Sequence, residues 1–289
     1  MTEQTDTAAL DVRAFAGSGR VPAPEEMARR ARSRGIVYYA ETYLRVARAY
    51  AGTFLLNAIG TPLLYMVAMG VGLGSMLDAK GTTVDGVSYL VFVAPAIMVA
   101  TSAQSAFGES TYPVMGGFKW QRTYFGPAAT PIDPRQIAWG HLVGVALRFT
   151  LQALIFWVIM VAFGAAPSGW SWVTIPITVL AALSMAAPMQ AYAATLESEG
   201  AQFTSIQRFV LMPMFLFAGT FFALDSMPGY LQWIGWISPI WHGSQLARWA
   251  TYGLVEPAWL VTTHILFLAA LVLFGAWSSA RTYRRRLWS

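Results

Sequence analysis

The chain of 289 residues has no cysteine, only two lysines and few charged residues of either sign. The absence of cysteine excludes a disulfide framework and thiolate metal sites. Charged residues make up 11% of the chain, whereas they make up about a quarter of a typical soluble domain. Hydrophobic residues account for 56%. This composition predicts an all-α membrane protein that is mostly surrounded by lipid.

The motifs that most often carry enzymatic chemistry are also missing. No G-x-x-x-x-G-K-[ST] phosphate-binding loop is present, since neither Lys80 nor Lys119 follows that pattern. The three histidines, His141, His242 and His264, show no metal-binding spacing, and we expect each to make a polar contact within a helical bundle. No Ser/His/Asp or paired-carboxylate set can be identified. We therefore expect no catalytic residue, bound cofactor or metal in this chain.

The basic residues gather in alternate segments between long apolar runs. Sixteen of the nineteen Lys and Arg residues precede the first run, follow the last, or lie after the second and fourth runs. The connections after the first, third and fifth runs hold only Lys80 and Arg248. This alternation follows the positive-inside rule and predicts an even number of spans with both termini in the cytosol. Attraction to anionic membrane lipids explains the basic clusters, so we expect no nucleic-acid binding.

A membrane-spanning helix needs about twenty mostly apolar residues to cross about 30 Å of hydrocarbon. Six segments meet this requirement, in agreement with the even number that the charge distribution predicts. They are residues 52–77, 89–106, 137–163, 172–196, 206–224 and 258–280. We therefore expect six transmembrane helices.

Two different segments precede the first span. Residues 1–34 are polar, contain proline and lack an apolar core, which indicates a disordered cytosolic tail rather than a cleavable signal peptide. Residues 36–50 place Tyr39 and Tyr43 on one face of a helix and Arg45 on the other. This pattern favours an amphipathic helix in the cytosolic interface. The alternative is an extension of the first span into the cytosol.

Residues 227–252 are too aromatic for an aqueous loop, yet each half is too short to cross the bilayer. Proline at position 239 divides the segment. Backbone can lie at membrane depth where helices or neighbouring protein satisfy its hydrogen bonds. A helical hairpin that enters from the outer face and returns fits these constraints. Its candidate residues are Trp233, Trp236, Pro239, Trp241 and His242.

The connection between the second and third spans, residues 110–136, lies in the cytosol in this topology. Two dipeptides that break helices bound part of this loop, Gly-Gly at 116–117 and Gly-Pro at 126–127. We expect a short helix between them that exposes Phe118, Trp120 and Tyr124. Aromatic residues flanked by cations on a rigid element are typical of a protein-binding surface. The alternative is a helix that lies on the membrane surface.

Arg148 is the only charged residue well inside a predicted span. Such a residue is expected to face the bundle, a partner or a water-filled cavity. The alternative is that the third span is longer than needed and Arg148 reaches the cytosolic headgroups with its long side chain.

Three stretches of the sequence resemble the type-2 ATP-binding-cassette exporter permeases. The first is the loop led by Glu109 with Gly-Gly-Phe-Lys-Trp-Gln-Arg at 116–122. The others are Phe-Ala-Gly-Thr-Phe-Phe-Ala-Leu-Asp-Ser-Met-Pro at 217–228 and Trp-Ile-Ser-Pro-Ile-Trp-His at 236–242. The resemblance covers most of residues 35–285, which we expect to form one permease domain. It is greatest to the branch of nodulation-factor (lipo-oligosaccharide) and daunorubicin-type drug export permeases.

This resemblance implies six helices, an interfacial helix before the first and a re-entrant hairpin before the last. It also implies a dimer of identical or related permeases on two separate cassette ATPases, which bind the ATP and Mg. The loop after the second span would be the coupling helix that docks on the ATPase, at about residues 117–124. The coupling candidates are Glu109, Phe118, Lys119, Trp120, Arg122 and Tyr124.

The family further implies that an amphipathic or lipid-linked substrate leaves the cytosol along the dimer interface of a bacterial inner membrane. The candidates for lining that path are Arg148, Phe215, Phe217, Phe221 and Phe222. The alternative for the phenylalanines is packed core. Two other functions remain open, a proton-coupled carrier and a membrane enzyme or scaffold. The spans show no acidic or histidine relay that would favour the carrier, and no clustered acidic or histidine residues that would favour an enzyme.

Overall fold

The computed structural model describes residues 23–197 and 200–288, and every regular element in these ranges is a helix. Five of the helices described are long and apolar enough to cross a membrane, by length and composition. The first, from Ala51 to Leu77, consists of an α-helix, a π-helical stretch and a final α-helical turn. The elements of the five are α3 Ala51–Tyr65, η1 Met66–Gly74, α4 Ser75–Asp78, α5 Tyr89–Glu109, α8 Pro134–Ala162, α9 Thr174–Ala193 and α14 Ala258–Leu287.

The predicted span at 206–224 is shorter and less regular than expected. Helical segments of six, five and six residues follow one another there as α10 Ala201–Ile206, the π-helical η3 Gln207–Leu211 and α11 Met212–Phe217. The helix ends at Phe217, because the chain turns at Gly219, whose positive φ of 72° suits glycine. The prediction that this helix continues to Leu224 was therefore wrong.

Small residues bring the central helices close together. Helix α9 packs against α14, α5 and α8, and its alanines at 181, 182, 186 and 187 are fully buried. A Cβ atom at Gly275 of α14 would overlap the backbone of Ala187 and Pro188. Close backbone approach of this kind is how membrane helices gain packing energy where lipid is as apolar as leucine.

Helix α8 begins at Pro134 because the residues around it form a complete N-terminal cap. The Asp133 carboxylate accepts a hydrogen bond from the Arg135 backbone N–H at 2.7 Å, and Gln136 Oε1 accepts one from the Asp133 N–H at 3.0 Å. This reciprocal pairing satisfies backbone donors that the first helical turn leaves free. Gln136 Nε2 also donates to the Arg32 carbonyl at 2.7 Å, which joins α8 to the helix before the first span.

That preceding helix, α2 Pro24–Ala49, is longer than the interfacial helix expected at 36–50. Pro24 fits the first turn, and Glu25 and Glu26 there are favourable beside the positive end of the helix dipole. The expectation of a disordered tail up to residue 34 was therefore wrong for 24–34. The rest of that tail, residues 1–22, lies outside the described residues.

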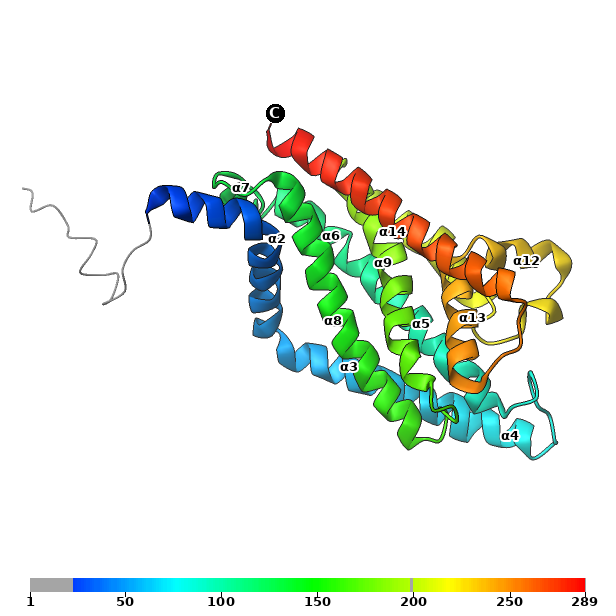
Figure 1. The fold of residues 1–289 in the computed structure, drawn as a ribbon. Coiled ribbons are helices and arrows are strands. Elements are labelled where there is room, and N and C mark those ends of the chain that lie inside the picture. Colours follow the sequence, from blue (N-terminus) through cyan, green and yellow to red (C-terminus); the bar gives the residue numbers. More distant parts are fainter. Residues whose placement is uncertain (1–22, 198–199, 289) are drawn as a thin grey trace, which may run out of the picture.

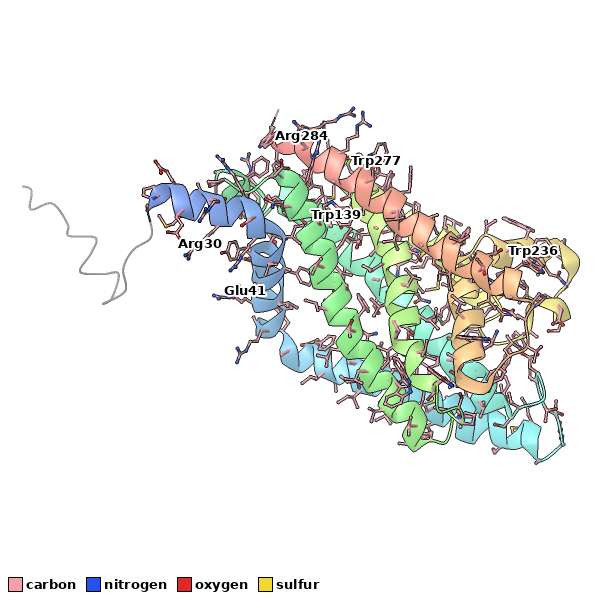
Figure 2. All side chains as sticks on the ribbon, in the orientation of Figure 1. Arg30, Glu41, Trp139, Trp236, Trp277 and Arg284 are labelled. Atoms are coloured by element: carbon pink, nitrogen blue, oxygen red, sulfur yellow. The ribbon has the colours of Figure 1, made fainter. Side chains whose placement is uncertain are left out.

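The basic segments and the tryptophan-rich segment lie at opposite ends of the helix bundle. The start of α8, the end of α14 and the short helix α7 Phe125–Ala128 lie together at one end in Figure 1, and α4 and α12 Gly229–Trp236 lie toward the other. Figure 2 likewise separates Arg284 from Trp236 by the length of α14. We call these the basic end and the tryptophan end of the molecule.

Candidate functional site

The loop after α5 folds into a compact unit at the basic end. Helix α6 Tyr112–Phe118 directly follows α5, the chain turns through residues 119–124, and α7 begins at Phe125. The helix expected between the glycine pair at 116–117 and Gly126-Pro127 is therefore not formed, and the segment proposed for coupling is mostly a turn. Arg122 adopts a positive φ of 53° in this turn.

Two of the three aromatic residues expected on the surface of this loop are buried. Only 4% of Phe118 and 2% of Tyr124 is exposed, whereas 52% of Trp120 is exposed. The Phe118 and Tyr124 rings lie 4.7 Å apart, and each lies within 5.0 Å of the Tyr283 ring of α14. The prediction of exposure was confirmed for Trp120 and was wrong for Phe118 and Tyr124, because the loop folds its aromatic residues back onto α14.

This aromatic cluster also includes the helix before the first span. The Tyr39 ring of α2 lies 5.9 Å from that of Tyr124. Burial, together with the neighbouring tyrosine, raises the pKa of Tyr39 well above its ordinary value, and burial does the same for Tyr124. Both hydroxyls therefore stay protonated. A movement of the loop must displace α2 and the end of α14 as well, because densely packed rings transmit strain.

The turn of the loop exposes residues 120–123, among which are one aromatic and one charged side chain. Trp120 is exposed, as is Arg122, whose guanidinium lies 4.8 Å from the Phe125 ring centre. Lys119 is half-buried. An indole and a guanidinium on a turn that is anchored from below can serve as the centre of a protein interface.

Arg148 pairs with Glu109, the last residue of α5. The Arg148 Nη1 and Glu109 Oε1 atoms form an ion pair, and 27% and 22% of the two side chains are exposed. The Tyr43 hydroxyl of α2 donates to the other Glu109 oxygen at 2.8 Å, and burial followed by the nearby carboxylate raises the pKa of Tyr43. The Arg148 guanidinium also lies 5.2 Å from the Phe54 ring centre in α3. Arg148 therefore contacts the carboxylate that leads into the loop, within the bundle of this chain.

The phenylalanines proposed for the translocation path lie in different environments. Phe215 is buried and contacts Phe221 edge to face, with ring centres 5.4 Å apart. Phe217 is half-buried, and 59% of Phe222 is exposed. The contact between Phe215 and Phe221 is core packing, which was the alternative interpretation. Phe222 is the member of the group that lies on the surface of a single chain.

The segment proposed as the outer hairpin forms two short helices at the tryptophan end, α12 and α13 Pro239–Tyr252. The Ser238 hydroxyl accepts from the Ile240 N–H at 3.2 Å, so the break falls at Ser238-Pro239 as predicted. Trp233 and Trp236 are more than half exposed, Trp241 is half-buried, and Pro239 and His242 are buried.

The buried end of this segment is held by polar contacts. His242 Nδ1 lies 2.6 Å from His264 Nδ1 of α14, and His242 Nε2 lies 3.0 Å from the Trp236 carbonyl. The expected polar contacts of these two histidines are confirmed. Glu256 Oε2 lies 3.3 Å from His264 Nε2. Within the described ranges, no group of three or more His, Cys, Asp or Glu side chains could hold a metal ion.

Arg248 is the residue of this region that the sequence did not single out. It is 1% exposed. Its guanidinium donates to the Phe92 carbonyl of α5 at 3.2 Å and to the Gly219 carbonyl beyond α11 at 2.7 Å. It also donates to Gln245 Oε1 at 2.9 Å. Arg248 therefore joins α13 to the end of α11. Its position in a connection otherwise poor in Lys and Arg was the only signal in the sequence.

Known proteins resemble the chain over nearly all of these elements. Residues 39–252 match the ABC-2 type transporter family. The chain is 30% identical to nodulation protein J of Rhizobium meliloti (strain 1021) over 260 residues, which cover 87% of this chain and 93% of that protein. It is 24% identical over 216 residues to the inner membrane transport permease YadH of Escherichia coli (strain K12), with 74% and 82% covered. The chain therefore belongs to the ABC-2 type transporter family.

Proposed function

We propose that this chain is the permease subunit of an ATP-binding-cassette exporter and that a separate ATPase drives it. The family match over residues 39–252 carries this proposal. Two permease chains, identical or related, would assemble with two ATPase subunits, which supply ATP and Mg. The substrate class we propose is an amphipathic or lipid-linked molecule, such as a lipo-oligosaccharide, a glycolipid or a drug. The similarity to nodulation protein J and to the YadH permease supports a transport role in a bacterial inner membrane.

In this proposal the helical run from Ala201 to Phe217 is the fifth of six spans along the chain. At about 1.5 Å per residue it is about 26 Å long, close to the thickness of the hydrocarbon core. Its exposed side chains include Phe209, Val210 and Leu216, which suit lipid or a second permease chain. Helices α12 and α13 are too short to cross and would dip in from the outer face. The basic end would then lie in the cytosol.

The ATPase would dock on Trp120 and Arg122. Because Phe118 and Tyr124 anchor the same turn to α14 and α2, a push on it would move both helices. The ion pair between Glu109 and Arg148 would carry the movement into α8. The substrate path would run between the two chains, beside α3 and α11, with Phe222 as its surface candidate.

Replacing Trp120 and Arg122 together by alanine tests the docking surface. We expect the variant to reach the membrane but to lose the ATPase during affinity purification, because its two exposed anchors are gone. Trp170→Ala is the matched control, since Trp170 is 69% exposed and lies in the connection between α8 and α9. Normal co-purification and normal stimulated ATP hydrolysis by the double variant would contradict the coupling assignment.

The energy source separates this proposal from a proton-coupled carrier. Cells depleted of ATP but supplied with a proton gradient should stop exporting an amphipathic test drug such as daunorubicin. Export that continues under these conditions would favour the carrier. The Arg148–Glu109 pair does not by itself distinguish the two functions, since ion pairs inside spans occur in both.

A further inference from the structure

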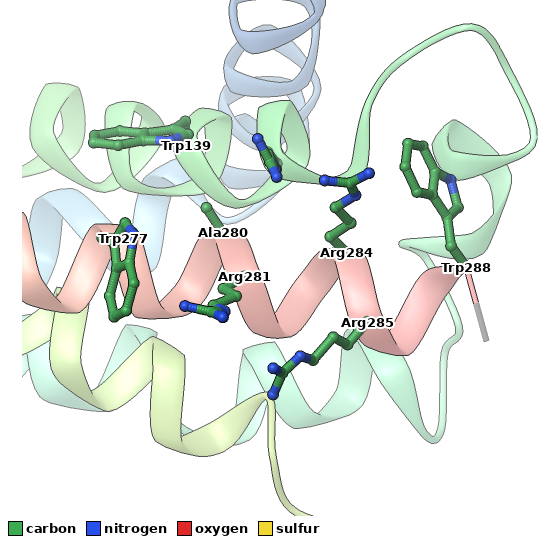
Figure 3. Close-up of a pocket in the computed structure, with 8 residues that line it drawn as sticks. Trp139, Trp277, Ala280, Arg281, Arg284, Arg285 and Trp288 are labelled. Carbon is green, nitrogen blue, oxygen red and sulfur yellow. The ribbon is translucent and has the colours of Figure 1, made fainter.

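A groove at the basic end, about 720 Å³ in volume, is lined by arginine and tryptophan from two spans. Figure 3 shows Trp277, Arg281, Arg284, Arg285 and Trp288 in sequence along α14, with Trp139 of α8 opposite Trp277. The remaining lining residues are Arg135 and Ala280, so no lining residue is acidic. We propose that this groove is a binding site for the phosphate headgroup of an anionic membrane lipid.

The depth of the groove along the membrane normal supports a lipid headgroup. The apolar part of α14, residues 258–277, comprises about twenty residues and is about 30 Å long, which matches the hydrocarbon thickness. Trp277 then lies at the edge of the hydrocarbon, where indole rings are preferred. Arg281, Arg284 and Arg285 follow within one to two and a half turns, at the level of the headgroups.

The chemistry of the groove is specific for an oxyanion. A guanidinium presents paired N–H donors that match phosphate oxygens, and several of them around one phosphate add charge attraction to these hydrogen bonds. Within the described part of the chain, the guanidiniums of Arg135, Arg281, Arg284 and Arg285 form no ion pair with an acidic side chain. Basic pockets between spans on the cytosolic side are known to bind lipid headgroups.

The positive-inside rule alone does not explain why arginines from α8 and α14 line the same groove. That rule requires positive charge near the cytosolic end and is indifferent to which helices share a cavity. Here Arg135 and the arginines of α14 come from distant parts of the sequence and converge on one groove. The apolar faces of Trp139 and Trp277 form the side toward the hydrocarbon, where an acyl chain would leave.

Replacing Arg281, Arg284 and Arg285 by lysine keeps all three charges and removes the paired donors. Native mass spectrometry of the full chain, purified in mild detergent, would measure binding of phosphatidylglycerol and of phosphatidylcholine with the same acyl chains. We expect one phosphatidylglycerol to bind each wild-type chain saturably, and the triple lysine variant to bind it about tenfold more weakly. The matched control replaces Arg29, Arg32 and Arg34 of α2, all exposed, by lysine and should bind normally.

Four outcomes would overturn the proposal. Equal binding of both lipids would show that the groove does not select an anionic headgroup. Equal binding by wild type and the folded triple lysine variant would show that positive charge alone holds the lipid, without the paired guanidinium donors. Displacement of the lipid by millimolar inorganic phosphate would indicate a free-anion site. If the triple lysine variant loses the ATPase from the purified complex while its lipid binding is unchanged, the groove is a protein-docking surface.

Discussion

Glu109 and Arg148 form an ion pair at the point where α5 leads into the loop that follows it. Replacing Arg148 by Gln leaves the Glu109 carboxylate half-enclosed without a counter-charge, and we expect a loss of about 1–3 kcal/mol in the free energy of unfolding. The double change with Glu109→Gln should cost less than the sum of the two single changes. Thermal unfolding in detergent measures the differences, and strict additivity would contradict a direct interaction.

The matched control for this pair is Arg45→Gln. Arg45 also pairs with a glutamate, Glu41, but 78% of its side chain is exposed. An exposed pair of this kind is worth less than about 1 kcal/mol, so the control should change unfolding little. Export should fall in Arg148→Gln and remain in Arg45→Gln.

Gly117 is a residue at which the loop has no space for a side chain. A Cβ atom there would overlap the Tyr124 ring, whereas one at the adjacent Gly116 would meet the Trp120 ring edge at an ordinary 3.5 Å. We expect Gly117→Ala to displace the turn and lower stability by about 1–3 kcal/mol. Gly116→Ala should stay within about 0.5 kcal/mol of wild type. Similar thermal unfolding of the two variants would show that the turn is not anchored as described.

At the scale of helices, Arg248 holds α13 to the end of α11 and to α5. Replacing it by Gln leaves the Gly219 and Phe92 carbonyls without charged donors in a buried site. Each such hydrogen bond contributes about 1.5–3 kcal/mol, so we expect faster hydrogen–deuterium exchange across residues 219–252. Lys80→Gln, an exposed change at the same end, should leave exchange unchanged. Unchanged exchange in Arg248→Gln would mean that other contacts hold these helices.

The sequence predicted the long helices well because twenty apolar residues have few alternatives in a membrane. The starts at Tyr89 and Ala258 were predicted to the residue, and the resemblance to the family was confirmed. The end of the fifth predicted span was missed, since the apolar run continues past Gly219 although the helix does not. Hydropathy shows which residues are apolar, but it does not show where the chain turns within an apolar run.

The loop was predicted less well than the helices. Its aromatic content suggested an exposed surface, but Phe118 and Tyr124 face Tyr283, which is about 160 residues further along the chain. The arginine groove was missed for the same reason, because Arg135 and Arg284 meet only after α8 and α14 have packed together. Contacts between distant segments depend on packing, which periodicity within one segment does not encode.

At the scale of the whole molecule, the proposed topology requires the run from Ala201 to Phe217 to cross the membrane. Because the chain has no cysteine, single cysteines can be placed on either side of it. We expect Thr195→Cys to react with an impermeant maleimide only after permeabilisation and Tyr230→Cys to react in intact cells. Trp170→Cys, on the outer side in either case, is the positive control. Labelling of positions 195 and 230 from the same side would contradict six spans.

The most direct test of the central claim is photo-cross-linking from the loop. A benzophenone maleimide attached to Thr123→Cys, an exposed position in the same turn that leaves Trp120 and Arg122 in place, should cross-link in native membranes to a cassette ATPase, identified by mass spectrometry, while the same probe on Trp170→Cys should not. That result would place the energy input of this permease at the turn between α6 and α7. Cross-linking of the ATPase from position 170, or from neither position although the ATPase is present in the membrane, would contradict the account.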